Sequence, residues 1–214
     1  MVGIVIFGML AVFFGLRLFA ILGRRTGHEQ NLAPVREEVT RTAPAIEDMN
    51  RAGPFTNALP AQDPQVINGI KAIVSADNHF DSGRFVEGAK SAYKMILEAF
   101  WRGDEVELAT LASEDVRSSF SEAIVARTTS GHRLDNRLVS IERVEILKAW
   151  LENKVAHITV KFIADIAAVT RDDSGKVVAG SLTDAVPTTD IWTFSRIVKA
   201  SSPEWTLTDT AESA

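Results

Sequence analysis

The chain has 214 residues, of which 46% are apolar and 24% charged, so it can form a packed core and is not a disordered chain. Its 23 basic and 28 acidic residues give a formal net charge of −5, which argues against a protein that binds nucleic acid. The absence of cysteine excludes disulfides and thiol nucleophiles, and the four histidines are scattered, so we expect neither a metal site nor a cofactor.

The first predicted element is a membrane-spanning helix over residues 2–22, within an anchor at 1–25. As a helix this stretch would rise ~32 Å, compared with a hydrocarbon core of ~30 Å. Its one charged side chain, Arg17, lies near the end and can extend to the lipid headgroups. Arg24 and Arg25 follow directly, so all three arginines are expected at the membrane interface.

Two other interpretations of this apolar stretch fit less well. A cleaved signal peptide would carry basic residues before the apolar run, and none precedes Val2. A helix buried in a soluble domain fits poorly because the stretch is apolar all round, with no polar face to turn toward water. Because Arg24 and Arg25 follow the span, the positive-inside rule places the N-terminus outside and the rest of the chain in the cytoplasm. A stripe of small residues, Gly8, Ala11 and Gly15, would also allow a homodimer.

Residues 26–64 have the composition of a flexible tether. Five of the seven prolines lie here, at positions 34, 44, 54, 60 and 64, among charged residues without helical or strand periodicity. A coil of this length spans roughly 30–35 Å on average, and prolines extend it further. We therefore expect a globular domain at 65–214 that is held near the membrane without being pressed onto it.

The first half of the globular domain reads as helical. Asp63-Pro64 is an N-cap followed by proline, and apolar residues then recur with helical spacing. A second helix is predicted over 83–102 and ends at Gly103. Asp104 begins a short third helix, and Ser113 is expected to cap a fourth.

After residue 131 the apolar period changes from helical to alternating. The clearest strand is 155–168, and others are predicted at 138–150, 188–199 and 204–210. A phase slip near Arg143 suggests a β-bulge, and residues 172–175 read as a hairpin turn. Helices followed by a strand meander indicate an α+β fold with helices on one face of an antiparallel sheet.

No catalytic motif is present, and we expect no enzyme. His157 and Asp165 would lie ~26 Å apart on one strand, too far to act together, and read as solvated residues. Asp190 and Arg196 share a strand face with Trp192 and Phe194. They can form a buried structural ion pair, or they can be polar groups at the edge of a ligand pocket.

A basic loop at 127–137 is the remaining candidate site. Arg127, His132, Arg133 and Arg137 lie there against a single acidic residue. Such a loop could contact lipid phosphates or an anionic partner, or it could simply be solvated.

From residue 80 onward the sequence resembles the C-terminal domain of the family of the forty-four-kilodalton subunit of the mitochondrial inner-membrane import translocase. The N-terminal pattern Leu22-Gly23-Arg24-Arg25-Thr26-Gly27-His28-Glu29 resembles the bacterial members called TimA-like adaptors. The pieces that carry the resemblance are Phe85-x-x-Gly88-Ala89-Lys90, Ala99-Phe100-x-x-Gly103-Asp104, Leu111-x-Ser113, Asp190-x-Trp192-Thr193-Phe194-x-Arg196 and Pro203-x-Trp205-x-Leu207.

The resemblance implies a nuclear-transport-factor-like cone, in which helices and a curved antiparallel sheet surround an apolar pocket. It also implies association with a bacterial inner membrane through anionic lipid such as cardiolipin, and recruitment of a DnaK-type chaperone or a translocase component. This chain departs from the mitochondrial relative in one respect: a span and a tether stand where that relative has a long N-terminal region for chaperone and channel contacts.

Three functions follow as competing hypotheses. The first is a membrane-tethered adaptor or scaffold. The second is a protein that binds a lipid or another small hydrophobic ligand in the cone, with Phe100, Trp192 and Phe194 as walls and Asp190 or Arg196 at the rim. The third is an enzyme with catalytic groups inside the cone, for which the sequence offers only Asp190 and Arg196 as polar groups.

Overall fold

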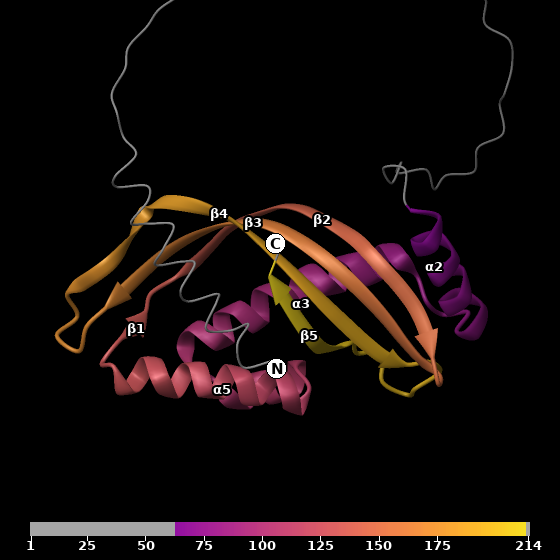
Figure 1. Ribbon diagram of the computed structural model, residues 1–214, viewed down its shortest axis with the longest axis horizontal. Helices are drawn as coiled ribbons and strands as arrows, with labels where there is room; N and C mark the ends of the chain where they lie inside the picture. The colour runs from indigo at the N-terminus through magenta and orange to yellow at the C-terminus, as the bar shows by residue number, and fades with distance from the viewer. Residues whose placement is uncertain (1–62, 213–214) are drawn as a thin grey trace, which may run out of the picture.

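The computed structural model describes residues 63–212, and the predicted anchor at 1–25 and almost all of the tether at 26–64 lie outside them. The described part is α+β, as the sequence predicted, and Figure 1 shows helices beneath a strongly curved sheet. In chain order its elements are α2 (Pro64–Ala76), α3 (Ser82–Arg102), α4 (Glu105–Leu111), α5 (Glu114–Thr129), β1 (Arg133–Leu134), β2 (Arg137–Glu152), β3 (Val155–Arg171), β4 (Val177–Ile197) and β5 (Thr206–Glu212).

The helices begin and end where the sequence places their caps. Asp63, Asp81 and Asp104 each accept a hydrogen bond from a backbone N–H in the first turn of the helix that follows. Gly103 ends α3 in the left-handed region, at φ 74°, where a side chain would be unfavourable. Ser113 occupies the N-cap position of α5, as predicted, but its side chain makes no capping hydrogen bond, and its backbone N–H donates to the carbonyl of Leu207.

The strands of the described region form one antiparallel sheet with β3 at its centre. β4 pairs with one side of β3 and β5 pairs with β4, while β2 and the short β1 share the other side of β3. A register shift between Ile141 and Arg143 confirms the predicted bulge. β4 begins at Val177, well before the predicted start at 188. The prediction missed the first half of the strand because that half is exposed and lacks the apolar alternation that marks a half-buried strand.

The core lies between α3 and the inner face of the sheet. Tyr93 of α3 stacks on Phe162 of β3, with ring centroids 4.3 Å apart and planes 12° from parallel. Trp192 and Phe194 of β4 complete this aromatic cluster, and Phe162, Phe194 and Tyr93 are fully buried. Close packing of this kind positions β4 relative to α3, and thereby the side chains of the candidate site.

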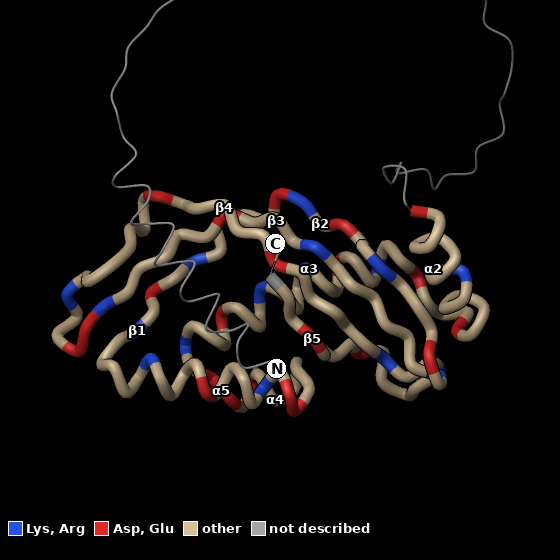
Figure 2. The backbone as a smooth tube through the Cα atoms, in the orientation of Figure 1, with Lys and Arg blue, Asp and Glu red and all other residues tan. Residues whose placement is uncertain are grey.

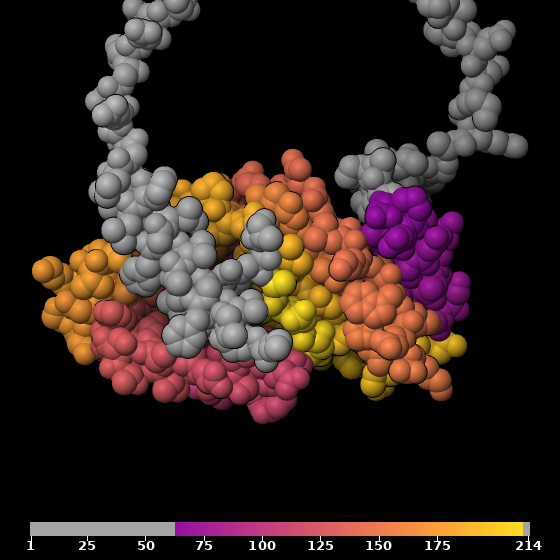
Figure 3. Space-filling view, viewed as in Figure 1, coloured from indigo at the N-terminus to yellow at the C-terminus, as the bar shows by residue number. Residues whose placement is uncertain are grey.

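One end of the sheet is covered by α2, which packs on β2 (Figures 1 and 3). The two elements approach so closely that a Cβ on Gly69 would lie 1.8 Å from the carbonyl oxygen of Ala149, so glycine is required there. Basic and acidic residues are interspersed along the described backbone (Figure 2). Within residues 63–212 no helix is long and apolar enough to cross a membrane, and the predicted span at 2–22 lies outside that range.

Candidate functional site

A cavity of about 210 Å³ lies between α3, α5 and the inner face of the sheet. Its walls are mainly apolar, and their large side chains include Leu97, Phe100, Trp101, Phe120, Ile166 and Trp192. Phe100 belongs to the last turn of α3 and packs against Phe120 of α5, with ring centroids 5.2 Å apart. The helices and the curved sheet therefore have a modest, largely apolar hollow between them, as the family resemblance implied.

The lining contains one carboxylate, that of Asp190. It is buried on β4 and accepts a 2.7 Å hydrogen bond from the hydroxyl of Tyr93. Burial, together with the charge of Asp190 and this hydrogen bond, raises the pKa of Tyr93 far above its ordinary value of 10.0. Tyr93 therefore stays a neutral donor over the whole physiological range.

Two N–H groups of the cavity lining have no acceptor among residues 63–212. The first is Nε1 of Trp192, a residue that is only 2% exposed. The second is Nη1 of Arg127, whose other terminal nitrogen donates to the carbonyl of Phe100 at 3.1 Å. The guanidinium also lies 5.2 Å from the centroid of the Phe100 ring, and its burial lowers the pKa of Arg127.

The predicted pairing of Asp190 with Arg196 is wrong. Residues six apart on one strand are separated by about 20 Å, so both can face inward without meeting. Arg196 instead donates to the carboxylate of Asp77 at 2.5 Å, and its guanidinium lies 5.1 Å from the centroid of the Trp205 ring. Asp77, at the C-terminal end of α2, was missed because nothing in the sequence connects two residues 119 positions apart.

The five residues predicted for one pocket are divided between two hollows. Phe100, Asp190 and Trp192 line the cavity described above. Phe194 and Arg196 line a separate groove of about 490 Å³ beside α3. The groove also contains Phe80, Phe85 and Trp205, three aromatic rings in mutual contact, with charged residues such as Arg84 and Glu204 at its edge.

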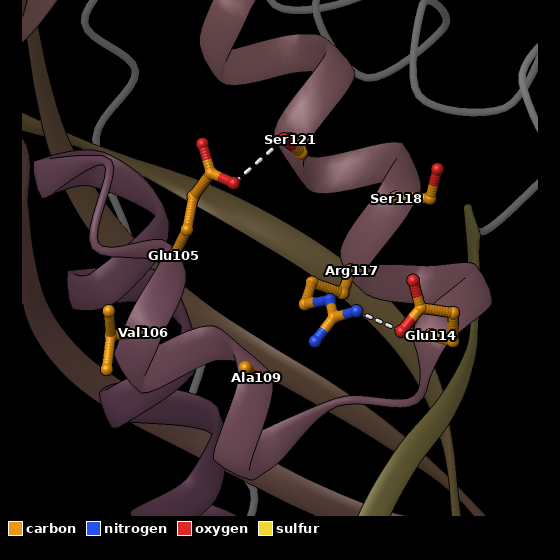
Figure 4. Close-up of a pocket in the computed structure, with 7 residues that line it drawn as sticks. All are labelled: Glu105, Val106, Ala109, Glu114, Arg117, Ser118 and Ser121. Atoms are coloured by element: carbon orange, nitrogen blue, oxygen red, sulfur yellow. Dashed lines mark hydrogen bonds and ion pairs between the residues drawn. The ribbon is translucent and has the colours of Figure 1, made fainter.

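A third hollow, of about 520 Å³, lies between α4 and α5 (Figure 4). Its walls are mostly polar and charged: Glu105 accepts a hydrogen bond from Ser121 at 3.0 Å, and Arg117 forms an ion pair with Glu114. Val106 beside it is 81% exposed. Because the charged groups satisfy one another, this hollow is a weaker candidate than the cavity or the groove.

The four basic candidates of the 127–137 loop differ in their surroundings. Arg127 is turned toward α3 and is engaged there, as described above, so it does not present its charge to a membrane surface. His132 is half-buried, whereas Arg133 and Arg137 are exposed at the start of β1 and β2. The membrane-interface candidates Arg17, Arg24 and Arg25 lie outside the described residues.

His157 and Asp165, which we expected to be solvated, lie on the outer face of the sheet. His157 is half-buried because its ring stacks on Trp150 of β2, with centroids 4.7 Å apart and planes 7° from parallel. Asp165 is also half-buried, further along the same strand. Among residues 63–212 no group of three or more histidines or carboxylates is arranged to hold a metal ion.

The sequence pattern of the Tim44-like domain matches residues 66–212, which is most of the chain and nearly all of the described fold. The chain belongs to the Tim44-like domain family. Members of this family are membrane-associated. No curated protein is similar enough to this chain to count as a match.

Two solved structures show a general similarity to the Tim44-like domain of this chain. The intermembrane space region of the chloroplast protein ARC6 has 15% identity and a TM-score of 0.45, over 64% of this chain and 98% of that one. A putative dehydratase of the NTF2-like family from Streptomyces avermitilis has 14% identity and a TM-score of 0.34, over 60% of this chain and 97% of that one. The family assignment rests on the sequence match alone.

Proposed function

We propose that the chain is a membrane-tethered adaptor that holds its Tim44-like domain at the cytoplasmic face of a bacterial inner membrane. The observation that carries the proposal is the match of residues 66–212 to a membrane-associated family in a chain that also contains the apolar stretch 2–22. A span joined by a tether to a folded domain restricts that domain to the membrane surface while leaving it free to reorient. This is the behaviour expected of a scaffold that recruits other proteins.

The partner class that we propose is a DnaK-type chaperone or a component of a translocation or membrane-protein assembly machine. The aromatic groove beside α3 is the surface we assign to it. Phe85 and Trp205 meet edge-to-face there, with centroids 4.7 Å apart, and Met95 at the edge is 39% exposed. An apolar segment of a partner could enter the groove, and Arg84 and Glu204 would contact charges beside that segment.

A photoreactive residue at Met95, crosslinked in intact membranes, tests this assignment. We expect the captured protein to be a chaperone or translocase component. Gly88 offers a specific blocking variant because it faces the groove and a Cβ there meets nothing within 4 Å. Gly88→Arg should abolish the capture, whereas Val106→Arg, at a position outside the groove, should not. Equal capture with the unsubstituted groove, with Gly88→Arg and with Val106→Arg would contradict the assignment.

A second candidate function is favoured by the 210 Å³ cavity inside the cone. A hydrophobic ligand that binds there would stabilise the native state by mass action, by about 2.7 kcal/mol at a hundredfold excess over its dissociation constant. The measurement is the unfolding transition of the protein with and without an extract of bacterial lipids. An unchanged unfolding transition would argue against ligand binding and would leave the adaptor role as the domain's function.

We assign no reaction to the domain. Tyr93 and Asp190 hydrogen bond to each other in the cavity, and Arg196 and Asp77 form an ion pair elsewhere. Paired groups of this kind support a structural role in the fold rather than proton transfer to a substrate.

A further inference from the structure

Gly88 is an exposed glycine in the interior of α3 that lines the aromatic groove, and a Cβ built on it would meet nothing within 4 Å. We propose that the groove binds an α-helix of the partner protein, which packs along α3 and makes its closest backbone approach at Gly88. The inference rests on the proposed adaptor function and specifies the form of the segment that enters the groove.

The glycine itself is the first part of the argument. A helix is less stable with glycine than with alanine at an interior position, so an interior glycine is explained by a close approach or by a special backbone conformation. Gly69 shows a close approach within the domain, because Ala149 lies against it. Gly88 is helical and has, among residues 63–212, no neighbour that would exclude a side chain. A close approach by a second protein accounts for it.

The surface around Gly88 has the spacing of a helix docking site. Residues separated by four, three and four positions lie on one face of a helix. Four exposed residues of α3 follow this spacing and line the groove: Arg84, Gly88, Ser91 and Met95. They extend along about three helical turns, or ~16 Å. The gap at Gly88 in this row is where a ridge of side chains on a second helix can enter, which is how helices pack on each other.

The walls of the groove favour a helix over an extended segment. An extended segment typically binds by pairing its backbone with the edge of a sheet. This groove is instead bounded by side chains of α3 and by the rings of Phe80, Phe85 and Trp205. A helix satisfies its own interior N–H and C=O groups. It therefore needs from the groove only a space for its apolar side chains, beside Trp205.

Charges at the groove define the polar residues of that helix. The guanidinium of Arg84 and the carboxylate of Glu204 both lie at the groove, and neither forms an ion pair among residues 63–212. Charged side chains on the neighbouring face of α3 pair with each other within the helix. The complementary occupant is an amphipathic helix with an acidic residue near Arg84 and a basic residue near Glu204.

Photocrosslinking in intact membranes, with the full chain and a photoreactive residue at Met95, tests the close approach. Gly88→Ala adds one methyl group at the crossing point and should reduce capture of the partner at least about 5-fold, the lower end of the cost of overpacking a contact. The same substitution should stabilise α3, so a loss of capture would not come from misfolding. Gly83→Ala adds a methyl group in the first turn of α3, outside the groove lining, and should leave capture unchanged.

A second photoreactive position measures the form of the bound segment. Probes placed one at a time at Arg84 and at Met95 are separated by ~16 Å along α3. They should attach to partner residues about 11 positions apart if the segment is a helix, and about 5 apart if it is extended. Mass spectrometry identifies the attached residues. Arg84→Glu should also lower capture at Met95 roughly 2- to 5-fold, whereas Lys90→Glu, outside the groove lining, should not.

Two results would overturn the proposal. One is undiminished capture by Gly88→Ala, which would show that no backbone lies against Gly88. The other is a spacing of about 5 residues, which would make the bound segment extended. In either case the adaptor function stands as long as Gly88→Arg abolishes capture. Unchanged capture by Gly88→Arg, or no capture at Met95 in the otherwise unsubstituted chain, would exclude the groove as the partner site and both proposals with it.

Discussion

The ion pair between Asp77 and Arg196 connects the end of α2 to β4, and both side chains are largely buried. We expect Asp77→Asn to lower the free energy of unfolding by about 3 kcal/mol, because the Arg196 charge would remain buried without its counterion. The measurement is urea unfolding at neutral pH. Asp184→Asn, on the exposed part of β4, is the matched control and should change the free energy by less than about 0.5 kcal/mol.

The same carboxylate gives this contribution a predictable pH dependence. Burial by itself raises the pKa of Asp77, but the backbone N–H groups of His79 and Lys199 and the charge of Arg196 hold it below 3.8 overall. A group whose pKa is lowered by folding stabilises the native state above its unfolded pKa. The difference in stability between the wild type and Asp77→Asn should therefore be complete above about pH 4 and shrink as the pH falls further. A difference that grew toward acid would contradict this account.

Tyr93 is the only tyrosine in the chain, so its ionisation can be observed directly. Because folding raises its pKa, native protein should show no tyrosinate absorbance at about pH 10, where a free tyrosine is half ionised. The stabilisation from this proton is complete below pH 10 and is lost as the pH rises above it. Appearance of tyrosinate near pH 10 with unchanged circular dichroism would show that the hydroxyl is not buried against Asp190.

At the scale of elements, helix boundaries were the most predictable feature. Caps such as Asp63 and Asp104, and the glycine at 103, act through the nearest backbone groups, so the sequence displays them directly. Ser113 shows the limit of this reasoning. Serine is a residue type that caps helices and it stands at the N-cap position of α5, but its side chain makes no capping hydrogen bond. The first half of β4 was missed because its side chains are mostly exposed, which leaves no periodic signal in the sequence.

Two glycines of the α3 region should respond to alanine in opposite directions. Gly103 has a φ of 74°, and alanine there should lower the free energy of unfolding by about 1 kcal/mol. Gly88 lies within the helix with open space beside it, and alanine there should raise the free energy by roughly 0.5–1 kcal/mol. Chemical denaturation of the two variants beside the wild type measures both. Changes of equal sign would mean that the helix boundary lies elsewhere.

At the scale of the whole molecule, the residue types of the site could be predicted but not their partners. The sequence showed that Asp190, Trp192 and Arg196 face inward on one strand. It could not show that Asp190 meets Tyr93 and that Arg196 meets Asp77, because those contacts depend on how α2 and α3 lie across the sheet. Separations of 97 and 119 residues carry no local pattern, so such contacts emerge only from the tertiary fold.

The orientation of the chain in the membrane is a prediction at this scale. Arg24 and Arg25 directly follow the apolar stretch 2–22, and the positive-inside rule then places residues 26–214 in the cytoplasm. Protease added outside spheroplasts should leave the Tim44-like domain intact, and lysis should make it accessible. Digestion of the domain in intact spheroplasts would reverse the proposed orientation.

Attachment to the membrane should depend on the N-terminal segment and not on the folded domain. Residues 65–214 contain 17 basic and 22 acidic residues, a net charge of −5, which an anionic leaflet repels. Arg133 and Arg137 are exposed in the basic loop, and at ~1 kcal/mol for each basic residue near an anionic surface their attraction is small beside that of a membrane span. Deleting residues 1–30 should therefore release most of the protein from membranes at about 0.15 M ionic strength, where charge interactions are screened beyond ~8 Å.

Sedimentation of membranes followed by detection of the protein in pellet and supernatant measures this release. The matched control is the full chain carrying Arg133→Gln and Arg137→Gln, which should stay in the pellet because its anchor is intact. Complete sedimentation of the truncated protein with anionic vesicles would contradict the prediction. The lipid attachment would then lie in the folded domain. Adding Arg133→Gln and Arg137→Gln to the truncated protein would show whether the basic loop supplies it. Local basic charge can outweigh the net repulsion only at close range, so the loop would have to contact the membrane directly.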